Sequence, residues 1–174
     1  MNRAAIAALI PHRGAMCLLA GVQEWDAQQL VCTATNHRDA NHPLRTRRGL
    51  LAGAAIEYAA QAMALHGALT GRTGLADGAA GGAAVGAAVG AAVGASAARA
   101  ATPGYLASAR SVQLHVLRLD NLPVAPRPDE LRIRVVRAAG DAQQILYTFD
   151  VSHAGRCVAA GRAAVVLNAS LRTL

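Results

Sequence analysis

The sequence predicts an α+β fold in which an antiparallel sheet wraps around one long central helix. Three observations predict it. Residues 50–69 (LLAGAAIEYAAQAMALHGAL) form one almost wholly apolar segment of good helix formers. Strand-like segments precede and follow this segment in the chain, and turn residues separate the last of them. A helix that is apolar on nearly every face must be covered by other structure, and the predicted strands can form a sheet that covers it.

The elements before the long helix follow from local patterns. Residues 4–10 predict a short helix, and residues 16–26 and 28–36 are typical of two strands. Residues 37–48 are polar and contain a proline, which indicates a loop.

The long helix carries three polar side chains, Glu57, Gln61 and His66. Ionisable groups are costly in a bilayer core, so these residues argue against a membrane span. We therefore expect a buried helix inside the protein.

Residues 71–102 differ from the rest of the chain. Their centre repeats AAVG with a period of four, which weakens a helix and offers little to fill a core. We interpret them as a flexible inserted loop within a single domain of residues 1–174.

Four strand-like segments follow this loop. Turn residues at 139–141 and 153–155 predict that the last three strands form an antiparallel meander. The four segments are residues 104–117, 130–138, 143–152 and 156–168. A short helix, two strands, one buried helix and four strands make up the hotdog architecture, which commonly pairs two copies into a dimer.

Composition and charge restrict the partners. The chain has 174 residues and a formal net charge of +7, and all 17 basic residues are arginine. This charge favours an acidic partner. The arginines are scattered, apart from Arg45, Arg47 and Arg48, so we expect no nucleic-acid partner.

The short apolar run before Pro11 is no secretory signal, which predicts a cytoplasmic protein. Neither the three cysteines nor the histidines have ligand spacing, so no metal site is predicted.

Three segments carry a family resemblance. They are IAALIPHRGAMCLL at residues 6–19, AAIEYAAQAMALHGAL at residues 54–69 and GYLASARSVQLHV at residues 104–116. They resemble the opening helix and PHR turn, the central helix and the following strand of the 3-hydroxyacyl-acyl carrier protein dehydratases. The resemblance is closest to the small hotdog branch associated with aryl polyene type pathways. It implies a lyase of fatty acid or polyene biosynthesis that acts on acyl groups carried by acyl carrier protein.

Glu57 is the first candidate catalytic residue. A carboxylate in an apolar helix is expensive unless it is paired, solvated or protonated, and such placement suits a residue for proton transfer. Gln61 lies one turn further on and either orients the carboxylate or bonds to backbone. In the resembled family a histidine precedes the carboxylate, and His42 is the nearest match here, with His37 as its rival. The histidine of the PHR turn, His12, is expected to bond to backbone.

Dehydration removes a proton beside a thioester carbonyl and expels hydroxide from the next carbon. We expect His42 to take the proton and Glu57 to protonate the leaving hydroxyl. The backbone N–H groups of Leu51, Ala52 and Gly53 would stabilise the thioester oxygen.

The resemblance also implies that the two catalytic groups come from different subunits of a dimer, identical or not. No metal or organic cofactor is implied, because the acyl chain arrives on a phosphopantetheine arm. The loop arginines either contact the carrier or are simply solvated. Three alternatives stay open: a non-catalytic hotdog partner subunit of a dehydratase heterodimer, a hotdog acyl thioesterase, and a binding module for acyl carriers.

Overall fold

The computed structural model describes residues 1–73, 104–125, 128–141 and 143–167. Its elements run in the order of two short helices, two strands, one long helix and four strands. The helical elements are α1 (Arg3–Ala7), the 3-10 helix η1 (Gly14–Met16) and α2 (Ala54–Thr73). The strands are β1 (Gly21–Trp25), β2 (Gln29–Ala34), β3 (Gly104–Leu114), β4 (Leu131–Gly140), β5 (Gln144–His153) and β6 (Arg156–Leu167).

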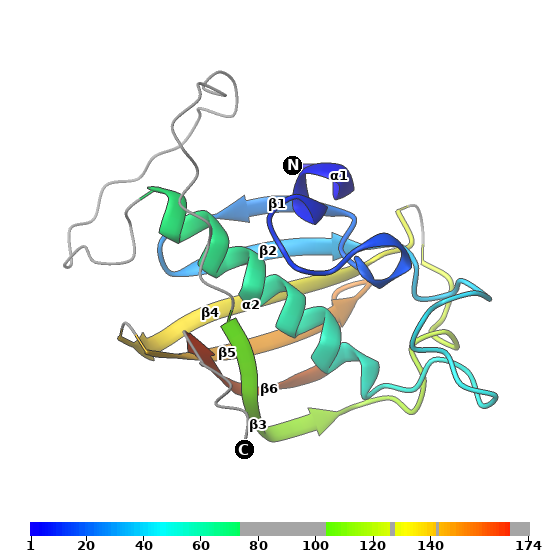
Figure 1. The fold of residues 1–174 in the computed structure, drawn as a ribbon. Coiled ribbons are helices and arrows are strands. Elements are labelled where there is room, and N and C mark those ends of the chain that lie inside the picture. Colours follow the sequence, from blue (N-terminus) through cyan, green and yellow to red (C-terminus); the bar gives the residue numbers. More distant parts are fainter. Residues whose placement is uncertain (74–103, 126–127, 142, 168–174) are drawn as a thin grey trace, which may run out of the picture.

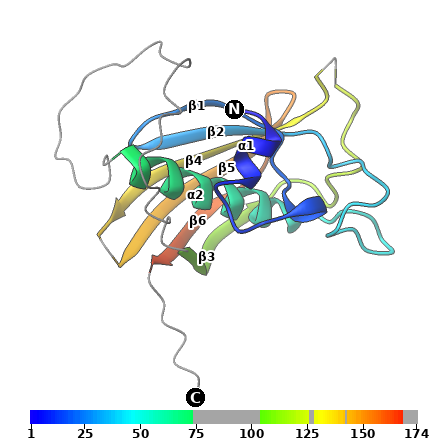
Figure 2. The same ribbon diagram turned by 45° about the horizontal axis from the view of Figure 1, so that its top comes forward.

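The strands form one antiparallel sheet in the order β1-β2-β4-β5-β6-β3. Helix α2 lies across one face of this sheet, and α1 lies beside it near β1 (Figure 1 and Figure 2). The predicted meander of the last three strands is confirmed, because β5 pairs with both β4 and β6. The fold is the predicted hotdog fold, with the sheet curved around its central helix.

The core lies between α2 and the concave face of the sheet. Strand β5 shows how the sheet contributes to it, since alternate side chains along the strand are buried and the others face outward. Helix α2 contributes both alanines and large side chains such as Tyr58 and Met63. The buried residues of these two elements include Ala55, Ala59, Ala62, Leu65, Ile145, Tyr147, Phe149 and Val151.

Several predicted boundaries are wrong. Helix α1 ends at Ala7 rather than at residue 10, and β3 ends at Leu114 rather than at residue 117. Helix α2 begins at Ala54 rather than at residue 50, because Leu50 and Ala52 pair with another segment. The Ala52 amide donates to the Leu117 carbonyl at 3.0 Å, and the Leu119 amide donates to the Leu50 carbonyl at 2.8 Å. The strand expected over residues 16–26 is shorter, since β1 begins only at Gly21.

The predicted inserted loop, residues 71–102, overlaps the end of α2, which continues to Thr73. The expectation of a loop is therefore wrong for residues 71–73, and the remainder of that segment lies outside the described residues. In the part of the chain that the structure describes, no helix combines the length and the apolar character needed to cross a membrane.

Candidate active site

Glu57 and Gln61 lie one turn apart on α2 and are hydrogen-bonded to each other. The Gln61 side-chain amide donates to Glu57 Oε1 at 2.9 Å. The Glu57 side chain is 31% exposed, whereas Gln61 is fully buried. The carboxylate is thus paired and open to solvent on one side, rather than sealed in the core.

Gln61 also binds the opening loop of the chain. Its amide donates to the Met16 carbonyl at 2.8 Å, and its Oε1 accepts from the Leu18 amide at 2.9 Å. The two roles that the sequence left open for Gln61 are therefore both present. One side chain orients Glu57 and fixes the opening loop against α2.

This loop places His12 on Glu57. His12 Nε2 lies 3.2 Å from Glu57 Oε1, and the His12 side chain is 26% exposed. The Arg13 guanidinium folds back onto the carbonyls of Ala7, Ile10 and His12, which holds the turn in shape. The expectation that His12 only bonds to backbone is wrong, because its ring contacts the candidate catalytic carboxylate. The PHR motif is the signal in the sequence that could have identified this residue.

His42 lies in a different network within the same chain. Its Nδ1 accepts from the Leu44 amide at 3.1 Å, and its Nε2 lies 2.9 Å from the Tyr58 hydroxyl. Because Tyr58 donates to Asn36 Oδ1 at 2.7 Å, the remaining proton of the neutral imidazole sits on Nε2 and points at Tyr58. Burial lowers the pKa of His42, which keeps the ring neutral near pH 7.

His37, the rival candidate, is fully buried at another place, beside Asp129 and His153. The structure thus brings Glu57 together with Gln61 and His12, and it leaves both His42 and His37 outside this cluster. Whether His42 acts across an interface between subunits stays a prediction.

The amides proposed for the thioester oxygen precede α2. The Ala52 amide is occupied by the Leu117 carbonyl, so this part of the prediction is left to the amides of Leu51 and Gly53. The carbonyls of residues 51–53 accept from the first three amides of α2, which anchors this turn on the helix.

The loop arginines divide into two kinds. Arg45 forms an ion pair with Asp120 at 2.9 Å, and Arg118 contacts the same carboxylate at 2.7 Å. The hydrogen bond from Arg118 lowers the pKa of Asp120 to about 2. Arg47 and Arg48 are exposed, so they are the members of this group that a partner can reach.

The arrangement suits proton transfer. A carboxylate held at one oxygen by an amide and an imidazole, and open to solvent at its side, can donate or accept a proton at a bound substrate. The imidazole can take up or return that proton at hydrogen-bond distance.

Comparison with known proteins supports the same family. The family model of the ApeP-like dehydratases, described as ApeP dehydratase, matches residues 4–83. This match includes the opening loop and α2, and therefore His12, Glu57 and Gln61. No curated protein matches this sequence.

Solved structures share the fold. The dehydratase heterocomplex ApeI:P from Xenorhabdus doucetiae has a TM-score of 0.65 and 21% identity, over 93% of this chain and 90% of that chain. The PaaI protein of the E. coli phenylacetic acid degradation operon has a TM-score of 0.53 and 11% identity, over 94% and 88%. AziG from S. sahachiroi has a TM-score of 0.52 and 17% identity, over 91% and 97%. The chain is a hotdog-fold protein, and its resemblance to the dehydratase-like family of aryl polyene type pathways is confirmed.

Proposed function

We propose that this chain dehydrates a 3-hydroxyacyl group on acyl carrier protein to the trans-2-enoyl thioester, as one subunit of a hotdog dimer. The contact of Glu57 with Gln61 and His12 carries the proposal, because it presents one partly exposed carboxylate with a proton-transfer partner. The match of residues 4–83 to the ApeP-like dehydratases supports it.

In the proposed reaction, a base takes a proton from the carbon beside the thioester carbonyl. Glu57 gives its proton to the hydroxyl on the next carbon, and water leaves as the double bond forms. The proton held by the base then returns to the Glu57 carboxylate, which restores the site without a cofactor. The amides of Leu51 and Gly53 stabilise charge on the thioester oxygen.

Two histidines are candidates for the base. His12 is favoured by its contact with Glu57 at 3.2 Å. His42 is favoured by the family resemblance, in which the histidine reaches the carboxylate of another subunit. To act as the base, His42 must release the hydrogen bond from the Leu44 amide, because that bond occupies its free lone pair.

The dimer would form along β3. This strand pairs with β6 on one side and ends the sheet on the other. An unpaired strand edge is a template for pairing with another chain. Three large hydrophobic side chains of β3 are 40–47% exposed: Tyr105, Leu106 and Leu114. Apolar exposure along an open edge supports a second hotdog subunit there, identical or different.

Acyl carrier protein would approach the start of α2. The exposed Arg47 and Arg48 precede the turn at residues 51–53, and guanidinium groups bind phosphate and carboxylate well. The net charge of +7 supports attraction of an acidic carrier. A cytoplasmic location is part of this proposal.

The test measures turnover of 3-hydroxyacyl-acyl carrier protein by the purified chain, with enoyl product and free acid quantified separately. Glu57→Gln is expected to lower the rate at least about 100-fold, as is typical for loss of a general acid. Glu24→Gln is the matched control, since its side chain is 62% exposed on β1 and should leave the rate unchanged. His12→Asn and His42→Asn identify the base, because of these two variants only the one that lacks the base should lose turnover while it stays folded.

Other outcomes would contradict the proposal. Release of free acid instead of enoyl product would identify a thioesterase. The chain would be a non-catalytic partner if it is inert alone and if wild type and Glu57→Gln activate a second hotdog subunit equally well.

A further inference from the structure

The pairing of three neighbouring strands brings a second group of polar residues together, away from Glu57. Ala34 at the end of β2 pairs with Leu131 at the start of β4, and Leu131 pairs with His153 at the end of β5. His37 follows Ala34 by three residues, and Asp129 precedes Leu131 by two. The register of the sheet therefore fixes all three side chains at one end of adjacent strands.

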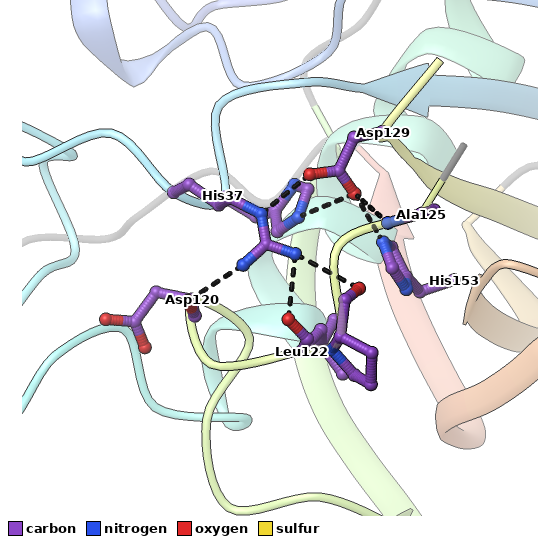
Figure 3. A network of polar contacts seen from close by, with 8 residues as sticks. His37, Asp120, Leu122, Ala125, Asp129 and His153 are labelled. Carbon is purple, nitrogen blue, oxygen red and sulfur yellow. Dashed lines mark hydrogen bonds and ion pairs between the residues drawn. The ribbon is translucent and has the colours of Figure 1, made fainter. Parts of the chain in front are cut away.

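The donor atoms of these residues face one another (Figure 3). His153 Nε2 lies 2.7 Å from Asp129 Oδ1, and His37 Nε2 lies 3.9 Å from the same oxygen. One donor atom from each residue lies within 4.8 Å of the others. Ligands of a tetrahedral Zn²⁺ at about 2.1 Å are about 3.4 Å apart. The two separations from Asp129 Oδ1 bracket that value, and all three ligand atoms lie within 4.8 Å of one another, so shifts of up to about 1.5 Å would complete the geometry.

His37 is the side chain that points to a ligand. It is 0% exposed, and neither ring nitrogen has a hydrogen-bond partner among the described residues. A buried polar group without a partner is destabilising, so such a group calls for a specific explanation. Imidazole nitrogen is a good ligand for first-row transition metals, so a bound metal ion is a partner that would satisfy this ring.

Arg38 orients the carboxylate. Its Nε donates to Asp129 Oδ2 at 2.7 Å, which turns Oδ1 toward the two histidines. Such a partner outside the ligands fixes ligand orientation in many metal sites. A long contact from the Ala125 amide, at 3.5 Å, also reaches Oδ1. The other two guanidinium nitrogens of Arg38 donate to the backbone carbonyls of Asp120, Leu122 and Pro123 at 2.8–3.2 Å (Figure 3).

We propose that His37, Asp129 and His153 bind a divalent transition-metal ion, with Zn²⁺ as the reference ion. Two imidazole nitrogens and one carboxylate oxygen form a donor set that suits Zn²⁺ and other first-row ions. The Asp129 side chain is 23% exposed, which gives the ion access and leaves room for a water ligand. The ion would tie the ends of β2, β4 and β5 together. This site shares no residue with the Glu57 cluster, so it stands independently of the proposed dehydratase activity.

Binding has a defined proton balance. His153 Nε2 carries the proton of its hydrogen bond to Asp129, and coordination through this nitrogen must displace it. The displaced proton moves to Nδ1 of the same ring or to the buffer.

The test titrates Zn²⁺ into chelator-treated wild type and into two variants, by calorimetry. We expect one tight ion per chain, and at least about 100-fold weaker binding in His153→Gln and Asp129→Asn. A chain with both His115→Gln and Cys157→Ala is the matched control, because His115 and Cys157 are exposed metal-binding side chains outside the cluster. This control should retain wild-type affinity within about threefold.

A second measurement needs no variant. Wild type loaded with Co²⁺ should show the visible absorption of a four- or five-coordinate site, and excess Zn²⁺ should remove it. Saturation at one ion per chain that is lost only in the cluster variants supports the site. Binding that is absent, or that disappears in the His115 and Cys157 control while the cluster variants retain it, would overturn the proposal.

Discussion

Loss of Gln61 should destabilise the protein more than a typical polar substitution, because this buried side chain has three hydrogen-bond partners. It is fully buried and bonds to the Met16 carbonyl, the Leu18 amide and the Glu57 carboxylate. Gln61→Leu keeps the volume and the helix propensity but removes all three partners. Leu18 is 1% exposed, so its amide would be left without a partner in the core.

The magnitude follows from these contacts. An unsatisfied buried backbone group costs about 1–3 kcal/mol; the Leu18 amide is such a group, and the partly buried Met16 carbonyl adds less. The partly exposed carboxylate regains water and adds little. We therefore expect a loss of roughly 2–4 kcal/mol, to which apolar burial of the new leucine gives a small offset. For a chain of this length that loss lowers Tm by roughly 5–15 °C.

The assay is urea unfolding followed by circular dichroism, with the free energy of unfolding extrapolated to water. Gln23→Leu is the matched control, because Gln23 is an exposed glutamine of β1 and should change stability by less than about 0.5 kcal/mol. A Gln61→Leu midpoint equal to wild type would refute the view that this side chain fastens the opening loop to α2. A stable variant with reduced turnover would instead leave Gln61 with the orienting role alone.

Four further substitutions test the packing of α2 and of the sheet beneath it. Burial lowers the pKa of His66, so the unfolded chain binds more protons at acid pH; stability should fall as pH drops below about 6.5. His66→Gln should therefore show a shallower loss of the urea midpoint between pH 7.5 and 5.5, and an identical slope would argue against a neutral buried ring. Gly161→Ala places a Cβ 2.9 Å from the Phe149 ring, so it should reduce the free energy of unfolding by about 1–3 kcal/mol and lower Tm. Gly67→Ala is its control on α2: the added Cβ meets open space, and Tm should rise. Tyr58→Phe removes the hydroxyl that links a buried histidine to an asparagine, and a cost of about 1–2 kcal/mol in chemical unfolding is expected; no change would mean that both groups find other partners.

Much of the fold could be predicted from the sequence because periodicity reports local burial. Alternation in β5 and the uniform apolar character of α2 translate directly into which faces are covered. The start of α2 could not be predicted this way. Leu50 and Ala52 have good helical propensity, but pairing with residues 117–119, far away in sequence, removes them from the helix.

The difference between local and long-range contacts also explains which parts of the candidate site could be predicted. Glu57 and Gln61 are neighbours on one helix, so spacing alone predicted their contact. His12 reaches Glu57 only because the opening loop is fastened by Gln61 and Arg13, and no spacing rule describes that path. The cluster of His37, Asp129 and His153 depends on strand register, which sets contacts across more than one hundred residues of chain.

The polar side chains of α2 differ in a way that separates structural from chemical roles. Among the described side chains of this helix, Tyr58, Gln61, His66 and Thr70 are buried, and each of them is hydrogen-bonded to the rest of the protein or to the helix itself. In a core with few aromatic residues, such directional contacts fix how the helix sits on the sheet. Glu57 is the exception, since it is held by its neighbours yet keeps about a third of its side chain exposed. A fastening role would favour a fully covered group with complete hydrogen bonding. A proton-transfer residue requires a carboxylate that its neighbours orient and that a substrate can still reach. This difference is the physical ground for assigning chemistry to Glu57 rather than to the other polar residues of α2.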